Sequence, residues 1–344
     1  MIRLAAFWIL LLLAGCSRPL PEGVTELTYA TPYPPSHPFS RADQRWIDYV
    51  AKASGGSLRI RPIWSGALLS SDMSMEELRH GVADIGLITP IYTRGSTHLI
   101  RTQSGFYSGA ESFESQVALY HCIEAGDPQV NRELEGLKVL AVQGGLLPGV
   151  LTRDIPVRSL SDLRGLRLRA PTELLSVLDD LGADPVNMPM ADVYSALAKG
   201  VIDGVIAPVD TLKVLHFAEV AKYYNTLKVP RGAYPSRAIG ERRWNELTDA
   251  QRSILTEGIP VWEAALAEEV QIGAEQGRAA AADGGVEMFD MPQQDQIRFE
   301  KLYLRDAERN AQRLERYGID GLAAFRIARS SVVARNQIEC GGRE

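Results

Sequence analysis

A short segment of the chain occurs twice, and the second copy resembles the first in residue order. Residues 78–90 read LRHGVADIGLITP, and residues 197–208 read LAKGVIDGVIAP. Each copy predicts a helix that ends at a glycine, then a short apolar strand that ends at a proline. Ligands of open α/β sheets bind beyond the carboxyl ends of the strands, so the two strand ends are expected to line one cleft. The alternative is that this order of elements is common among α/β proteins.

Strand and helix patterns also alternate through the first part of the chain. Residues 27–30 and 58–61 read as strands, and apolar residues between positions 46 and 51 recur at helical spacing. This alternation predicts an α/β fold with parallel or mixed sheets and helices on both faces. Beyond the N-terminal segment about 320 residues remain, more than one core usually holds, so two lobes are expected.

Two long helical patterns follow the second copy. Residues 249–282 contain few helix breakers, and a helix of that length is expected to brace both lobes. Residues 293–317 are amphipathic and rich in Arg, Glu and Asp, which indicates a solvated face.

The N-terminus has the order of a secretory signal. A basic residue, Arg3, precedes an apolar run over residues 4–13, which is too short to span a bilayer. The following Leu13-Ala14-Gly15-Cys16 resembles the lipobox of bacterial lipoproteins. We therefore expect a signal peptide at 1–15, lipidation of Cys16 and a polar tether over 16–24, so that the membrane is contacted only through the lipid. The alternative is a plain signal peptide that happens to contain a cysteine.

Lipidation of Cys16 would leave two cysteines, Cys122 and Cys340. The sequence leaves open whether they form a disulfide, because it does not give the separation of their Cα atoms. No CxxC motif or Cys/His cluster predicts a metal site, and no cofactor is expected. The net charge of −6 and the lack of a basic run argue against a nucleic-acid partner.

One arginine stands where a strand is expected to meet a helix. The alternating pattern of residues 165–169 predicts a strand that ends at Arg169, and Thr172 is a plausible N-cap for a helix over 173–181. A guanidinium beside a helix N-terminus offers donors to an anion from two sources. The alternative is an arginine paired with a nearby Asp or Glu.

Four motifs around this arginine resemble one family. LRGLRLRAP at 163–171, LGADP at 181–185, DVYSAL at 192–197 and GVIDG at 200–204 look like the solute-binding proteins of TRAP (tripartite ATP-independent periplasmic) transporters, of the dicarboxylate-binding type. The resemblance runs from about residue 27 to residue 317 and is most specific over 163–208. It implies a two-lobed periplasmic binding protein (type II-like), in which a long helix packs on both lobes and the lobes close over one organic acid.

The resemblance suggests a division into lobes. We expect residues 25–146 with 235–275 in lobe I, residues 147–234 with 276–330 in lobe II, and a C-terminal tail over 331–344.

The resemblance also implies roles for single residues. The arginine that binds the ligand carboxylate matches Arg169, and a bulky cleft residue matches Met190. The position of a frequent cleft asparagine holds Ala207, and an upstream arginine of some members falls near Pro148, where this chain has none. A less polar cleft leads us to expect a monocarboxylate with an apolar or aromatic body, bound mainly by Arg169.

The remaining cleft candidates lie beside these positions or at the ends of the expected strands. They are Tyr33, His37, Thr89, Pro90, Tyr92, Ala170, Pro171, Thr172, Met188, Pro208, Asp210 and Tyr234.

The expected function is that of a periplasmic receptor that passes a small organic acid to TRAP membrane subunits. A ligand-binding co-receptor for a sensor kinase is the first alternative, and the sequence does not separate the two. A periplasmic enzyme is the second alternative, but the sequence contains no G-x-S-x-G, H-E-x-x-H or P-loop motif and its histidines are scattered without ligand spacing, so no catalytic activity is expected.

Overall fold

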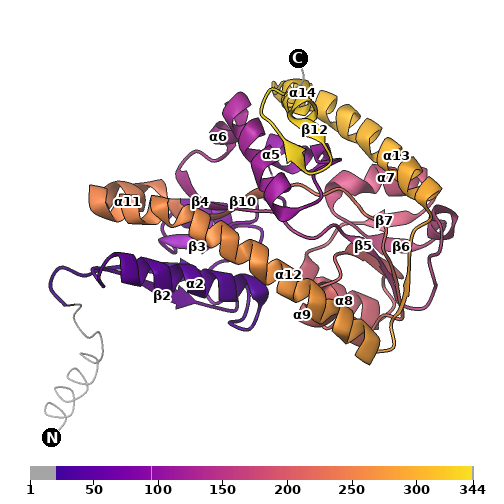
Figure 1. Cartoon of the computed structure of the whole chain (residues 1–344), viewed down its shortest axis with the longest axis horizontal. Helices are drawn as coiled ribbons and strands as arrows, with labels where there is room; N and C mark the ends of the chain where they lie inside the picture. Colours follow the sequence, from indigo (N-terminus) through magenta and orange to yellow (C-terminus); the bar gives the residue numbers. More distant parts are fainter. Residues whose placement is uncertain (1–20, 94, 343–344) are drawn as a thin grey trace, which may run out of the picture.

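The computed structural model describes residues 21–93 and 95–342, and the expected signal peptide and Cys16 lie outside these residues. Two α/β lobes lie side by side, each built on one sheet (Figure 1). The sheet of lobe I has the strand order β2-β1-β3-β10-β4. Its strands are β1 (Thr25–Ala30), β2 (Leu58–Ile63), β3 (Ile85–Leu87), β4 (Leu137–Gln143) and β10 (Tyr234–Gly240).

The sheet of lobe II has the strand order β11-β9-β5-β8-β6-β7. Its strands are β5 (Gly149–Thr152), β6 (Arg167–Arg169), β7 (Asp184–Val186), β8 (Gly204–Ala207), β9 (Tyr223–Asn225) and β11 (Glu287–Phe289). The two segments that resemble one another are α3 (Ser74–Arg79) with β3 and α8 (Met190–Ala198) with β8, and each sheet contains the strand of one of them.

Each sheet contains one strand that runs against its neighbours. Strand β10 is antiparallel to β3 and β4, and β5 is antiparallel to β8 and β9. Both strands follow a crossing between the lobes, over residues 144–148 and 226–233. The neighbouring strands end at the edge of the sheet that faces the other lobe. A strand that follows a crossing begins at this same edge, so it must run antiparallel to its neighbours. The sheets are therefore mixed.

The helices of lobe I are α2 (Pro38–Ala53), α3 (Ser74–Arg79), α4 (His98–Thr102), η1 (Gln103–Phe106), α5 (Phe113–Gly126), α6 (Gln129–Glu133), α10 (Glu241–Glu246) and α11 (Asp249–Glu257). Helix α2 buries Trp46, Ile47 and Val50 in the core of this lobe. The ring of Trp46 stacks on that of Trp262 with 3.8 Å between centroids. Trp262 belongs to the long helix α12 (Ile259–Asp283), so this contact holds α2 against α12.

The helices of lobe II are η2 (Leu160–Leu163), η3 (Thr172–Leu174), α7 (Leu175–Asp180), α8 (Met190–Ala198), α9 (Thr211–Val214) and η4 (Phe217–Glu219). The segment from η2 to β6 consists of a short 3-10 helix and then the strand that the sequence predicts. Ser159 and Asp162 form a capping box at its start, in which each side chain accepts a hydrogen bond from the backbone of the other.

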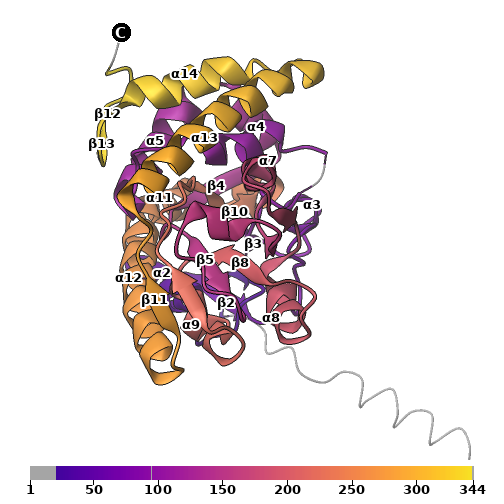
Figure 2. The ribbon, with the colours of Figure 1, turned by 90° about the vertical axis from the view of Figure 1, so that its right-hand side faces the viewer.

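Helix α12 (Ile259–Asp283) braces both lobes, because it packs on α2 and β4 on one side and on α9 and β11 on the other (Figures 1 and 2). The predicted single helix over 249–282 is divided into α11 and α12 at Gly258. A Cβ at Gly258 would lie 2.8 Å from Nε1 of Trp46, so the close packing of α2 requires glycine at the joint. Gly277 lets α12 approach the backbone at Val209 and Asp210 in the same way.

The C-terminal helices differ from the expected division of the lobes. They are α13 (Gln293–Gln312), η5 (Arg313–Tyr317) and α14 (Gly321–Ser331). Helix α14 packs on α5, and its Phe325 meets Phe106 edge to face at 5.2 Å, so residues 321–331 contribute to the core of lobe I. The assignment of all of 276–330 to lobe II does not hold for α14, since an amphipathic pattern does not say which lobe the apolar face meets.

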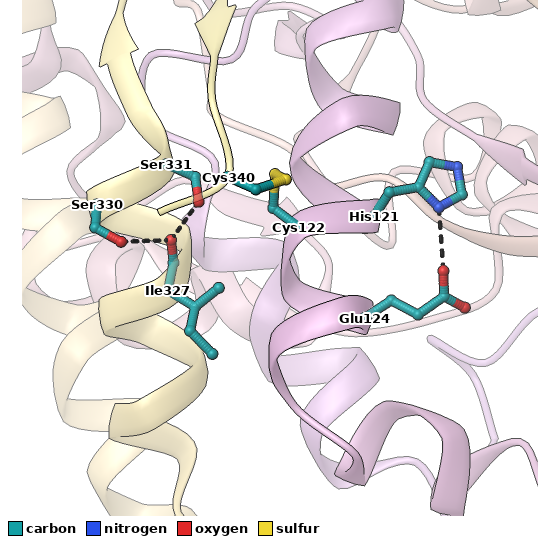
Figure 3. Close-up of a disulfide and its surroundings, with 7 residues drawn as sticks. All are labelled: His121, Cys122, Glu124, Ile327, Ser330, Ser331 and Cys340. Carbon is teal, nitrogen blue, oxygen red and sulfur yellow. Dashed lines mark hydrogen bonds and ion pairs between the residues drawn. A yellow bond between two sulfur atoms is a disulfide. The ribbon is translucent and has the colours of Figure 1, made fainter. Parts of the chain in front are cut away.

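The tail beyond α14 is attached to lobe I. It forms a hairpin of β12 (Val332–Ala334) and β13 (Gln337–Ile338), and Cys340 is joined to Cys122 of α5 by a disulfide with 5.1 Å between Cα atoms (Figure 3). The pairing that the sequence left open is therefore present in the structure.

Candidate functional site

Arg169 joins the two lobes at the carboxyl end of β6. The residue is only 2% exposed, its Nε donates to the carbonyl of Met188 at 2.9 Å, and its Nη2 lies 3.4 Å from the hydroxyl of Tyr92 in lobe I. Strand β6 pairs with β8, so the arginine stands beside the Pro-terminated end of the second copy, while Tyr92 follows the end of the first. A residue beside the end of the second copy thus contacts one that follows the end of the first.

Arg169 has no ion-pair partner among the residues that the structure describes. The alternative of a structural Arg–carboxylate pair is therefore not what is found. Glu173 lies near enough for the charge of Arg169 to act on it. Burial raises the pKa of the Glu173 carboxyl, and the nearby arginines, Arg169 first among them, oppose this rise.

Three tyrosines surround this junction. Tyr33 stacks on the imidazole of His37 at 4.1 Å between centroids, and its pKa is raised by burial and by the nearby Tyr234 and Tyr92. The hydroxyl of Tyr234 accepts from Nε2 of Gln143 at 3.4 Å, and burial raises its pKa too. The phenols of Tyr33 and Tyr234 are therefore neutral rather than ionised, which suits a site for an anion with an apolar body.

His37 has a structural role that the sequence did not assign. It is the N-cap of α2, and its Nδ1 accepts a hydrogen bond from the backbone N–H of Phe39 at 3.2 Å. Burial, together with the charges of Arg237 and Arg41, lowers the pKa of the imidazole to about 3, so the ring is neutral at physiological pH.

Two further arginines reach the cluster, and sequence reasoning missed both. Arg237 of β10 is fully buried and pairs with Asp43 of α2 at 3.0 Å, while its Nη2 has no hydrogen-bond partner in the described structure. Arg231, in the crossing over 226–233, is half-buried against Gly145 of the other crossing. No local pattern marks these positions, because only the pairing of distant segments brings them together.

Asp210 lies at the N-terminal end of α9, beneath the bridging helix. Its Oδ1 is buried without a hydrogen-bond partner, and a Cβ at Gly273 would stand 3.4 Å from its own Cβ. Burial raises the pKa of the carboxyl to about 6, and the charge of Arg231 opposes the rise.

Several other predicted residues build the framework of the site. Thr89 is buried and bonds to Ser71 and Ser74, and the carbonyl of Pro90 accepts from Thr97 at 2.8 Å. The carbonyl of Ala170 accepts from the amide of Asn187 at 3.0 Å.

The end of the second copy is likewise structural. Ala207 is fully buried in a core cluster of lobe II, and its carbonyl accepts from the hydroxyl of Tyr224. The carbonyl of Pro208 accepts from Thr211 at 2.6 Å.

The predicted cap at Thr172 is wrong. Pro171, in an extended conformation, is the N-cap of a 3-10 turn, the helix α7 begins only at Leu175, and no side chain caps either start. Thr172 is instead exposed at a cavity of about 400 Å³ that is also lined by Arg101 and Arg313.

Met190 begins α8 and faces a groove of about 570 Å³ that Pro34 of lobe I closes from the other side. The residue is thus at the junction of the lobes, although no contact with Arg169 is found.

The described part of the chain contains neither a candidate metal site nor a candidate membrane-spanning helix. Within residues 21–93 and 95–342, no group of three or more His, Cys, Asp or Glu side chains is placed to hold a metal ion. No helix in the same ranges has the length and apolar character needed to cross a bilayer.

Known proteins resemble this chain in sequence and in structure. RD1_1052, a solute-binding protein of Roseobacter denitrificans, is 31% identical over 128 residues, which cover 37% of this chain and 38% of that protein. The sialic acid-binding periplasmic protein SiaP of Vibrio cholerae is 30% identical over 112 residues, or 31% of this chain and 34% of that protein. The alignments thus span little more than a third of these relatives.

Solved structures match over nearly the whole chain. A TRAP solute-binding protein from Rhodoferax ferrireducens T118, in complex with copurified benzoate, has a TM-score of 0.81 at 23% identity, covering 90% of this chain and 98% of that one. One from Bordetella bronchiseptica, with bound mandelate, has a TM-score of 0.77 at 20% identity and the same coverage. These likenesses show the fold, and the predicted two-lobed α/β architecture is confirmed.

The model of one family matches residues 29–312 of the chain. Its members are solute receptors, and the resemblance to TRAP solute-binding proteins is confirmed by this match and by the solved structures. The chain belongs to the bacterial extracellular solute-binding proteins, family 7.

Proposed function

We propose that this receptor binds one small organic acid at the cluster between its lobes and delivers it to TRAP membrane subunits. One observation carries the proposal: Arg169 is almost completely buried where the lobes meet, bonds only to a carbonyl and a phenol, and has no carboxylate partner in the described structure. A buried guanidinium without a counter-ion is costly, and a ligand carboxylate supplies the missing charge.

The surroundings favour a monocarboxylate with an apolar or aromatic body. Tyr33, Tyr92 and Tyr234 offer aromatic surface at the cluster. Apolar walls contribute about 25 cal/mol per Å² removed from water and do not stabilise a second charged end. The benzoate and mandelate complexes of similar fold agree with this ligand class, although other solved relatives hold D-glucuronate or galacturonate.

The first test removes the guanidinium of Arg169. Loss of one partner of a buried charge pair typically costs about 2–5 kcal/mol, so Arg169→Ala is expected to weaken binding roughly 30-fold to several thousandfold. Arg169→Lys is expected to bind poorly as well, because an ammonium does not reproduce the planar fork. Isothermal titration calorimetry with an acid found in a thermal-shift screen measures both effects.

A matched control lies two residues away on the same strand. Arg167 is exposed and pairs with Asp184 at 3.6 Å, so Arg167→Ala is expected to leave affinity within a fewfold. If Arg169→Ala binds the acid as well as the Arg167→Ala control does, the carboxylate is bound elsewhere.

The receptor is proposed to return its ligand unchanged, without catalysis. Recovery of intact acid after incubation and denaturation supports this, whereas consumption of the acid identifies an enzyme. A sensor-kinase co-receptor would bind the same acid, and growth on that acid as sole carbon source, lost when the receptor is deleted, distinguishes uptake from sensing.

We further propose that the mature protein is periplasmic and begins at a lipidated Cys16, on the strength of the lipobox-like residues 13–16. Mass spectrometry of the membrane fraction is expected to find an acylated Cys16, and a Cys16→Ser protein that stays in that fraction contradicts the assignment.

A further inference from the structure

We propose that Arg231 is a second carboxylate-binding residue, which together with Arg169 holds the acid group of the ligand. The inference deepens the proposed function and rests on it. Nothing in the motifs around residues 163–208 points to this residue, which comes from the second crossing between the lobes.

The guanidinium of Arg231 is positioned by the other crossing. A Cβ at Gly145 would lie 2.8 Å from its Cζ, so the arginine rests on backbone that only glycine leaves open. Gly145 is itself fixed, because its N–H donates to Oε1 of Gln116 at 2.7 Å and its carbonyl accepts from Nε2 of the same amide at 3.0 Å. The residue therefore lies on a rigid support rather than on a mobile loop.

The charge of Arg231 reaches the whole cluster. It opposes the rise in pKa of Tyr33 and Tyr234 from lobe I and of Glu173 and Asp210 from lobe II. Arg169 acts on Glu173 as well, so both guanidiniums lie near that carboxyl.

Arg231 is nevertheless unpaired. Within the described ranges its guanidinium has no hydrogen bond or ion pair, and it is half-buried. Burial raises the pKa of the two carboxyls near it, Glu173 and Asp210, and neither forms an ion pair with its guanidinium in the described structure. An anion bound in the cluster would neutralise the charges of Arg169 and Arg231 together.

The chemistry of a carboxylate fits two arginines. Nε and Nη2 of Arg169 are directed at the carbonyl of Met188 and the hydroxyl of Tyr92, which leaves part of its fork for a ligand. A carboxylate has about four acceptor positions, enough for a second guanidinium from another direction.

The arrangement also compensates for a residue absent from the sequence. Pro148 lies near the position at which some members of the family have an arginine. Its carbonyl accepts from the N–H of Val229 at 3.0 Å. Arg231 thus stands two residues after Val229, at a contact between the two crossings. It supplies the second cation from the crossing over 226–233, whereas Pro148 belongs to the crossing over 144–148.

The test compares Arg231→Ala with Arg101→Ala by titration calorimetry, with benzoate and mandelate as first probes and succinate as a dicarboxylate. Arg101 also acts on Glu173, but it donates to the carbonyl of Thr93 at 3.3 Å and faces the neighbouring cavity. We expect Arg231→Ala to weaken binding at least tenfold and Arg101→Ala less than threefold, with similar apo melting temperatures. Equal affinity of the two variants overturns the inference, whereas a parent protein that binds no acid overturns the proposed function.

A double-mutant cycle tests the positioning directly. Gly145→Ala would push the guanidinium away, so it is expected to weaken binding in the parent and to add little in the Arg231→Ala background. If Gly145→Ala costs the same factor in both backgrounds, its effect does not pass through Arg231 and the proposed geometry is wrong.

Discussion

The carboxyl of Asp210 illustrates how one buried residue couples the site to pH. Burial raises its pKa from 3.8 to about 6, although the charge of Arg231 and backbone hydrogen bonds oppose the rise. The folded protein holds this proton more tightly than the unfolded chain does. The contribution of Asp210 to stability is therefore fully present below about pH 4 and is lost as the pH rises through about 6.

Asp210→Asn is expected to remove that loss. The unfolding free energy of the variant minus that of the parent should rise by about 3 kcal/mol between about pH 4 and pH 7.5. A pKa shift of about two units corresponds to about that energy. Urea denaturation at several pH values measures the difference. A difference that stays constant with pH would mean that Asp210 titrates normally.

At the scale of secondary-structure elements, we expect the tail of the chain to affect stability rather than binding. The disulfide between Cys122 and Cys340 closes a loop with a sequence separation of 218 and holds α14 and its hairpin against α5 (Figure 3). In the chain-entropy model a loop of this length stabilises the folded state by about 5 kcal/mol.

Replacement of both cysteines by serine is expected to lower the melting temperature and to leave ligand affinity unchanged, because the bond ties down the tail rather than the Arg169 junction. Scanning calorimetry with and without reductant makes the comparison. The parent should lose stability on reduction, and the double variant should not respond. Identical melting of both proteins in oxidising buffer would show that the bridge adds no stability.

Local patterns in the sequence carried most of the fold but only part of the site. The repeated helix–Gly–strand segment predicted one strand in each lobe, and Arg169, beside the second strand, contacts Tyr92, which follows the first. Arg231 escaped prediction because its place depends on two crossings 86 residues apart, 145 and 231, that pack together only in the folded molecule. The break at Gly258 escaped because a single glycine is tolerated in a helix, and only the packing of Trp46 shows why it is needed.

At the scale of the whole molecule, both lobes contribute to the proposed anion site, and α12 lies along both of them (Figure 1). Arg169 comes from lobe II, the three tyrosines come from lobe I, and Arg231 comes from a crossing. A ligand that contacts all three groups stabilises the arrangement in which the lobes are closed, whereas a ligand that contacts one lobe leaves the other free to move.

We therefore expect the cognate acid to raise the unfolding free energy by about 2.7 kcal/mol at a hundredfold excess over Kd, which corresponds to a shift of several degrees in Tm. Without ligand the lobes are free to unfold in separate steps, and with ligand they are expected to unfold in one, because loss of either lobe destroys the site. Scanning calorimetry over a ligand series measures both effects, with Arg169→Ala as the control, whose shift at the same ligand concentration should be much smaller. A ligand that raises Tm while the lobes still melt separately must bind within one lobe, and the site between them would then be excluded.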